Sequence, residues 1–109
     1  MERAEVCLTP SIVLAEVAAM CVRDGFEDRI VSEELESIRE CSVIVPIDEP
    51  LAIAGAHAAA ELRARARARR LPLPGLADGL VLATARGSHS HLLSGDPHFQ
   101  ELPETIWLG

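Results

Sequence analysis

Short β-branched runs alternate with longer helical stretches along this chain, and that alternation constrains the fold more than any other feature. We expect strands at 42–47, 91–94 and 105–108, with a weaker strand pattern at 5–8. We expect helices at 11–22, 26–39, 51–70 and 76–86. Strands separated by helices pair in parallel under a helical cover. The pattern therefore predicts an α/β fold with a short parallel sheet, in a single domain over residues 1–109.

The core of such a domain has to be built from aliphatic side chains. Hydrophobic residues make up 49% of the sequence, but it contains only two Phe, one Trp and no Tyr. This composition excludes disordered and collagen-like classes. Cys7, Cys21 and Cys41 show no C-x-x-C spacing, so we expect small buried thiols rather than disulfides or a zinc finger.

Charge and hydropathy indicate where the protein is located and what it can bind. No apolar run reaches the roughly 18 residues that a membrane span needs, and the first residues do not resemble a signal peptide. We therefore expect a soluble cytoplasmic protein that does not enter a membrane. The net charge of −7 argues against non-specific coating of nucleic acid, although a local basic patch could still bind it.

Three acidic residues stand where a charge is costly. Glu16 is the one charged residue in the apolar stretch 12–22, Asp78 lies in the apolar stretch 76–83, and Asp96 directly follows a predicted strand. An unpaired buried carboxylate costs several kcal/mol. None of the three has an Arg three or four residues away to neutralise it.

If these acids converge, a divalent cation would offset their repulsion. Mg²⁺ prefers a few carboxylates and retained waters, and Mn²⁺ also accepts oxygen ligands. Such a cation can activate water and stabilise charge on a phosphate, so hydrolysis of a phosphodiester is the expected chemistry.

Each acid also has a structural alternative. Asp78 could cap the helix that it begins, and Asp96 could be a turn residue in Gly-Asp-Pro. Glu16 could point along one solvated edge of its helix. The sequence leaves these alternatives open.

Two segments resemble a known family. Leu76–Arg86 followed by His91–Phe99 resembles the C-terminal half of a PIN domain, and Ser11–Val17 resembles that family's second acidic motif. The resemblance is to VapC-type toxin ribonucleases. It implies a three-layer α/β/α fold with a parallel sheet, bound Mg²⁺ or Mn²⁺, cleavage of single-stranded RNA and inhibition by a small antitoxin protein. By motif position the catalytic acids and metal ligands would be Glu16, Asp78 and Asp96, with Ser94 helping to position metal-bound water.

The sequence departs from that family at two places. Family members carry a first strand that ends in Asp before the Glu16 motif, and residues 1–15 contain no such strand. A second acid often follows two residues after the last one, where this chain has His98. Without its first strand the chain would pair exposed strand edges with a second copy, so we expect a homodimer. The alternative function is a catalytically silent PIN-like module that acts through protein contacts.

Two further clusters remain. Within the run 63–70, a helical wheel places Arg63, Arg67 and Arg70 on one face, while Arg65 and Arg69 point elsewhere. The first three are candidate RNA phosphate contacts, and the alternative is a solvated helix end. His89 and His91 would share one face of a strand, which raises a weaker zinc hypothesis.

Overall fold

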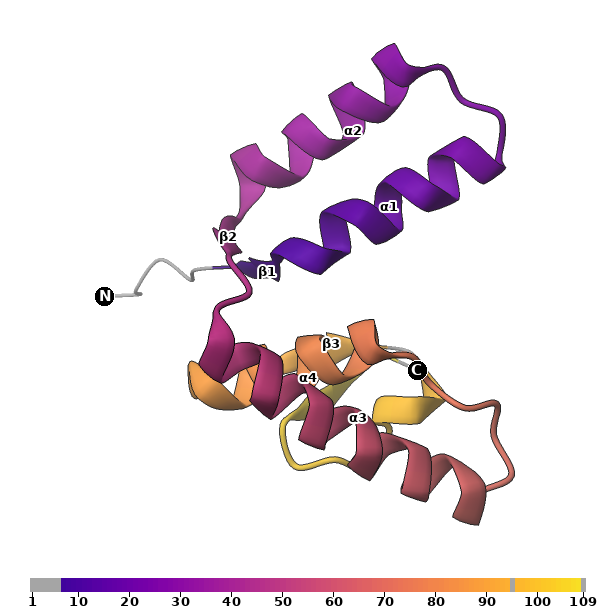
Figure 1. Cartoon of the computed structure of the whole chain (residues 1–109), viewed down its shortest axis with the longest axis vertical. Helices are drawn as coiled ribbons and strands as arrows, with labels where there is room; N and C mark the ends of the chain where they lie inside the picture. Colours follow the sequence, from indigo (N-terminus) through magenta and orange to yellow (C-terminus); the bar gives the residue numbers. More distant parts are fainter. Residues whose placement is uncertain (1–6, 95, 109) are drawn as a thin grey trace. The chain divides into compact units, whose positions relative to one another are not determined.

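The computed structural model describes residues 7–94 and 96–108 (Figure 1). The helices are α1 (Ser11–Arg23), α2 (Asp28–Cys41), α3 (Glu49–Ala68) and α4 (Leu76–Gly87), with a single 3₁₀ turn η1 (Pro97–Phe99). The strands are β1 (Leu8–Pro10), β2 (Val43–Val45), β3 (Leu92–Ser94) and β4 (Thr105–Trp107). Every predicted helix and strand is present, each within a few residues of its predicted bounds. The start of the predicted strand 5–8 lies outside the described residues.

The chain divides into two compact units, Met1–Ile47 and Asp48–Gly109. We call them unit 1 and unit 2 and describe each by itself. The single domain over residues 1–109 stays a prediction.

Unit 1 is a helical hairpin attached to a pair of parallel strands. β1 pairs with β2 in the register Leu8↔Val43 to Pro10↔Val45. Between α1 and α2 the chain turns at Gly25, whose φ of 84° is accessible to glycine without strain. The amide of Phe26 closes this turn by donating to the carbonyl of Cys21, a Schellman-type helix end.

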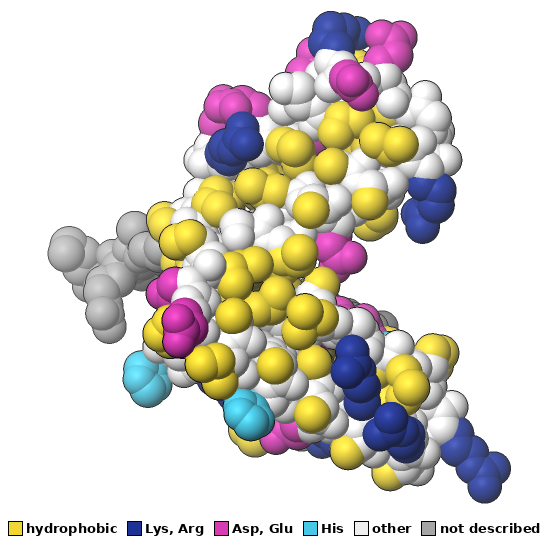
Figure 2. Space-filling view, in the orientation of Figure 1, with side chains coloured by type: hydrophobic (Ala, Val, Ile, Leu, Met, Phe, Trp, Pro, Cys, Tyr) yellow, Lys and Arg dark blue, Asp and Glu magenta, His cyan; other side chains and the backbone are white. Residues whose placement is uncertain are grey.

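Helix α1 corrects one expectation. An apolar helix was predicted to be buried, yet none of its thirteen residues is buried, and Glu16 is exposed. Met20 is 53% exposed and Val22 61%. Figure 2 shows hydrophobic side chains open to solvent along the hairpin. The physical reason is that α1 packs against α2 and β1, which leave much of its surface uncovered.

The cysteines are also less buried than predicted. Cys7 and Cys41 are exposed, and Cys21 is partly buried. Cys7 directly precedes β1 and Cys41 is the last residue of α2, so both lie at element ends rather than in a core.

Unit 2 contains the main core, in which α3 and α4 pack closely. A Cβ added at Gly79 would lie 2.6 Å from the backbone nitrogen of Ala59, so the two helix backbones meet here. Leu62 and Leu82 are fully buried on either side of this contact. Ala58, Ala83, Phe99 and Leu102 complete the cluster. The predicted aliphatic core is confirmed in this unit.

A second pair of parallel strands, β3 and β4, lies in unit 2. Their register runs from Leu92↔Thr105 to Ser94↔Trp107. The α/β class with short parallel pairing is confirmed, although the described strands form two two-stranded sheets, β1-β2 and β3-β4, rather than one sheet. Since each strand is three residues long, each pair is held by few ladder hydrogen bonds.

Candidate active site

Asp78 lies in the first turn of α4, where the sequence suggested a cap. The backbone N–H of Gly75 donates to Asp78 Oδ2 at 3.2 Å. The carboxylate thus caps the N-terminus of the helix, where its negative charge also interacts favourably with the helix dipole. Within the described residues, no hydrogen bond engages its other oxygen, Oδ1. Capping therefore leaves one oxygen of Asp78 available to a ligand.

Asp96 forms the turn that leaves β3. Its Oδ1 accepts from the backbone N–H of His98 at 2.9 Å, and its own N–H donates to Ser94 Oγ at 2.9 Å. The hydroxyl oxygen of Ser94 thus binds the backbone of Asp96 and not its carboxylate. The turn role proposed for Asp96 is present, and Oδ2 has no hydrogen bond among the described residues.

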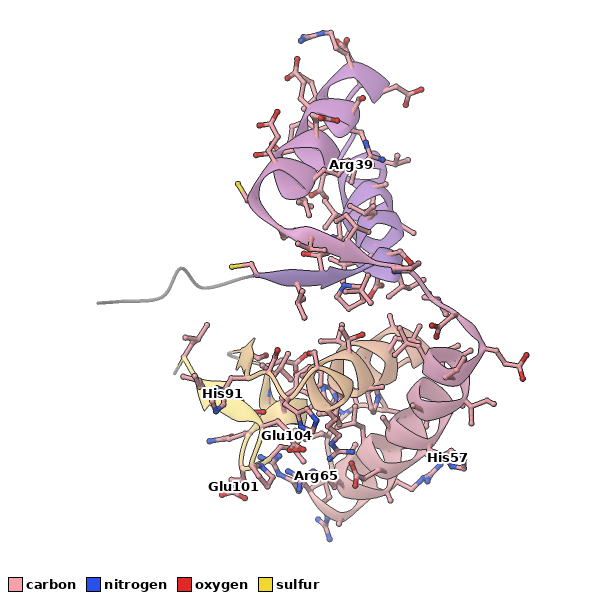
Figure 3. All side chains as sticks on the ribbon, turned by 90° about the vertical axis from the view of Figure 1, so that its left-hand side faces the viewer. Arg39, His57, Arg65, His91, Glu101 and Glu104 are labelled. Carbon is pink, nitrogen blue, oxygen red and sulfur yellow. The ribbon has the colours of Figure 1, made fainter. Side chains whose placement is uncertain are left out.

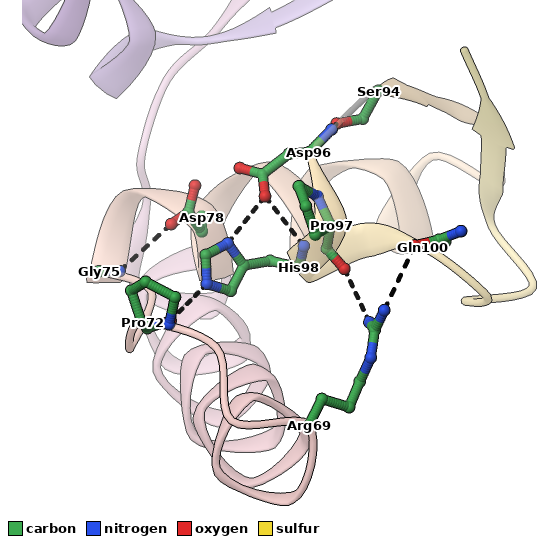
Figure 4. A network of polar contacts seen from close by, with 9 residues as sticks. All are labelled: Arg69, Pro72, Gly75, Asp78, Ser94, Asp96, Pro97, His98 and Gln100. Carbon is green, nitrogen blue, oxygen red and sulfur yellow. Dashed lines mark hydrogen bonds and ion pairs between the residues drawn. The ribbon is translucent and has the colours of Figure 1, made fainter. Parts of the chain in front are cut away.

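His98 bonds to one of the two acids, Asp96 (Figure 4). Its Nδ1 lies 2.8 Å from Asp96 Oδ1, and its Nε2 contacts the carbonyl oxygen of Pro72. A carbonyl and a carboxylate only accept hydrogen bonds, so both ring nitrogens are best satisfied when protonated. The side chain of Asp78 lies beside the same ring (Figure 4).

The surroundings of His98 favour its cationic form. The hydrogen bond to the Pro72 carbonyl raises its pKa, and so do the bond to Asp96 and the charges of Asp96 and Asp78. Together they outweigh burial, which acts in the opposite direction, and the pKa of His98 lies above its ordinary value of 6.5. Asp78 and Asp96 therefore both act on the same imidazole ring.

Glu16 belongs to unit 1 and is exposed on α1. Its meeting with Asp78 and Asp96 stays a prediction. Within residues 7–94 and 96–108, no group of three or more His, Cys, Asp or Glu side chains is arranged to hold a metal ion.

The donor chemistry of the acid pair still suits a hydrated cation. Mg²⁺ is commonly bound through one or two carboxylates and keeps several waters. Asp78 and Asp96 come from different elements, lie near the same imidazole ring, and each has an oxygen that no described group uses. These residues fit a divalent ion that retains most of its water.

The arginine run is divided differently from the helical-wheel prediction. Arg63 Nε donates to the carbonyl of Pro74 at 3.2 Å. Arg65 and Arg69 reach the turn that follows Asp96, as described below. Sequence reasoning missed both, although their i, i+4 spacing already placed them on one helix face.

A second polar cluster lies at the far end of α4 and was not predicted. Arg86 lies 2.8 Å from Glu61 and 2.6 Å from Glu104. The hydrogen bond from Arg86 holds the pKa of Glu104 below its ordinary value. Arg65 adds to this effect, and Figure 3 shows its side chain near Glu104. An open pocket of about 440 Å³ adjoins the cluster, lined by Ala54, His57, Ala58, Glu61, Ala83, Arg86 and Gly87.

The strand placement of His89 and His91 is wrong. His89 has a φ of 53° in the turn after α4, and His91 precedes β3. The two rings therefore do not share a strand face, which removes the basis of the zinc hypothesis.

None of the described helices combines the length and hydropathy needed to cross a membrane.

Comparison with known proteins gives one match. Neither the curated proteins nor the solved structures contain a significant match to this chain. The family model of the PIN domain, in contrast, matches residues 1–105, which span both units. PIN domains are generally nuclease domains, and they usually use a divalent metal ion. The chain therefore belongs to the PIN domain family.

Proposed function

We propose that this protein is a metal-dependent endoribonuclease of the VapC toxin type that cleaves single-stranded RNA. The observation that carries the proposal is that the His98 ring bonds to Asp96 and lies close enough to Asp78 to be affected by its charge. The match to the PIN family supports a nuclease activity for this pair.

In this proposal Asp78 and Asp96 hold Mg²⁺ or Mn²⁺, and Glu16 supplies a third carboxylate. When bound there, such an ion would supply a water of lowered pKa and positive charge to stabilise the phosphate. Ser94 holds the backbone of Asp96 through its hydroxyl oxygen. His98 fixes the direction of the Asp96 carboxylate through both its backbone N–H and its ring. These contacts keep Asp96 in one orientation before RNA arrives.

RNA would meet the positive end of α3. Arg67 and Arg70 are exposed there, and the half-buried Arg63, which donates to the Pro74 carbonyl, is the third candidate contact. Each phosphate that they neutralise would make binding to a single strand more sensitive to salt.

The alternative is a catalytically silent module in the cytoplasm that binds an antitoxin or a second copy of itself. The exposed apolar side chains of the hairpin, among them Met20, Val22 and Phe26, favour this alternative. Large exposed hydrophobic patches commonly mark protein-binding surfaces. Both the nuclease and the silent module are compatible with a homodimer in which free strand edges pair.

An RNA cleavage assay separates the two. With Mn²⁺ or Mg²⁺ the wild type should cut a single-stranded RNA, and EDTA should stop it. Asp78→Asn and Asp96→Asn should each lower the rate by about 10²-fold or more, because each removes a charged ligand of the ion that would stabilise the reacting phosphate. The matched control is Asp24→Asn, which makes the same change at an exposed residue of unit 1.

Cleavage that continues in EDTA, or that is equal in all three variants, would contradict the nuclease proposal. Absence of any cleavage by a folded wild type would favour the silent module.

A further inference from the structure

The turn that follows Asp96 is short and depends on contacts from outside itself. Residues 96–100 contain a single 3₁₀ turn and lead directly away from the three-residue strand β3. Inside the turn, the amides of Phe99 and Gln100 donate to the carbonyls of Asp96 and Pro97. Asp96 also bonds to Ser94 and His98, so the bonds within residues 94–100 fix the shape of the turn but not its position against α3.

Two arginines at the C-terminal end of α3 bind this turn. Arg69 Nη1 donates to the Pro97 carbonyl at 2.7 Å, and its Nη2 donates to Gln100 Oε1 at 3.3 Å. Arg65 Nη2 donates to the Gln100 carbonyl at 2.7 Å. One guanidinium therefore spans both ends of the turn, as Figure 4 shows for Arg69, and a second holds its last carbonyl. Arginine suits this role because its donors are fixed in a planar fork.

The segment before Asp78 is tied down in a related way. Arg63 donates to the Pro74 carbonyl, and the ring of His98 contacts the Pro72 carbonyl. Gly75, the next residue, is the one whose amide Asp78 caps. The same end of α3 thus holds both segments that carry the acid pair.

From these contacts we infer that Arg65 and Arg69 are positioning residues for Asp96, and that they do not act as RNA contacts. The inference rests on the proposed function, since it assigns a role within that site. A guanidinium that bound a phosphate instead would have to give up its bonds to the turn and release Asp96.

The remaining arginines provide the contrast. Arg67 lies between Arg65 and Arg69 in the sequence and is exposed. Among the described residues we find no side-chain hydrogen bond from Arg67 or from Arg70. Arg69 is exposed as well, so the bonds to the turn, and not exposure, distinguish Arg65 and Arg69 from Arg67 and Arg70.

The test compares Arg69→Gln, Arg65→Gln and Arg69→Lys with Arg67→Gln in the full chain. Three quantities are measured: Mn²⁺ affinity, the salt dependence of RNA binding in EDTA, and kcat and KM for cleavage. Arg29→Gln is the neutral control, because Arg29 makes an exposed pair with Glu33 in unit 1. Thermal unfolding of each variant checks that it is folded.

We expect Arg69→Gln to weaken Mn²⁺ binding by about tenfold or more, the usual effect of removing a group that orients a metal ligand. It should lower kcat at an unchanged KM and leave the salt slope unchanged. Arg65→Gln should act in the same direction. Arg69→Lys should recover part of the Mn²⁺ affinity, because an ammonium can reach one of the two acceptors but cannot span them as a fork. Arg67→Gln should reduce the salt slope by about 0.7 and leave Mn²⁺ affinity unchanged.

The inference is overturned if Arg69→Gln and Arg65→Gln reduce the salt slope as Arg67→Gln does while Mn²⁺ affinity stays at the wild-type value. A wild type that binds no Mn²⁺ would overturn the proposed function instead. In that case the hydrogen bond of the His98 ring tests the positioning role of Arg69. Its proton on Nδ1, observed by NMR as a hydrogen-bonded signal, should be lost in Arg69→Gln if the turn is released, and its persistence would refute the positioning role.

Discussion

Helices α1 and α3 show that the hydrophobicity of a segment does not decide its burial. Residues 12–22 of α1 are apolar except for Glu16, yet no residue of that helix is buried. Helix α3 carries three arginines between 63 and 67, yet it buries Gly55, Ala58, Ala59, Leu62 and Ala66. The difference is the neighbour, because α3 has a closely fitting partner in α4. A small residue opposite a glycine is buried more completely than a large apolar residue with nothing to cover it.

The largest effect should come from truncating the core of unit 2. Leu62→Ala removes a fully buried side chain and should lower the free energy of unfolding by about 2–5 kcal/mol. Met20→Ala in unit 1 should change it by less than about 0.5 kcal/mol, because Met20 is largely exposed. Urea denaturation measures both. Equal losses would contradict the contrast between the two units and would indicate that α1 is covered in solution.

The close approach of α3 and α4 can be broken at one atom. Gly79→Ala would place a methyl group against the backbone of Gly55 and Ala59, so it should destabilise unit 2 by about 1–3 kcal/mol or more. Gly87→Ala is the matched control on the same helix, since its added Cβ meets nothing within 4 Å. That control should be neutral or stabilising by up to about 1 kcal/mol. Thermal unfolding of the two variants in parallel measures the difference in stability. Equal stability of the two would refute the contact.

Much of this architecture was predictable. The order of helices and strands followed from β-branched runs such as 43–45 and from the break at 71–75, because these signals are local. The exposure of Glu16 was one of two alternatives that the sequence left open, since the choice depends on which surfaces reach α1. The role of Arg65 and Arg69 was missed for the same reason, because their acceptors lie about thirty residues away, at Pro97 and Gln100. The acids Asp78 and Asp96 were found, and so were the capping and turn roles that each one also performs.

A pH series tests the ion pair of unit 2 against an exposed pair of unit 1. The hydrogen bond from Arg86 lowers the pKa of Glu104 below 4.5, so its stabilisation is present above about pH 4.5 and is lost as the pH falls through the lowered pKa. Glu104→Gln should remove this acid dependence from the unfolding free energy. Glu33→Gln, in the exposed pair with Arg29, should change little. An unaltered acid profile in Glu104→Gln would contradict the assignment.

His98 should give a smaller effect of opposite sign. Because its pKa is raised above 6.5, its stabilisation is present below pH 6.5 and is lost as the pH rises through the raised pKa. His98→Asn should remove the loss of stability that the wild type shows as the pH rises above 6.5. NMR titration of the ring gives the pKa directly, and a value at or below 6.5 would contradict the bonds to Asp96 and Pro72.

Calorimetric titration with Mn²⁺ tests the central claim most directly, using the wild type, Asp78→Asn, Asp96→Asn, Glu16→Gln and the control Asp24→Asn. If the acids hold one ion, the wild type and the control should bind it alike. Each of the other three variants should then bind it at least about tenfold more weakly, because each loses a charged ligand. Equal Mn²⁺ affinity in all five proteins would contradict the account, whatever RNA the protein cleaves.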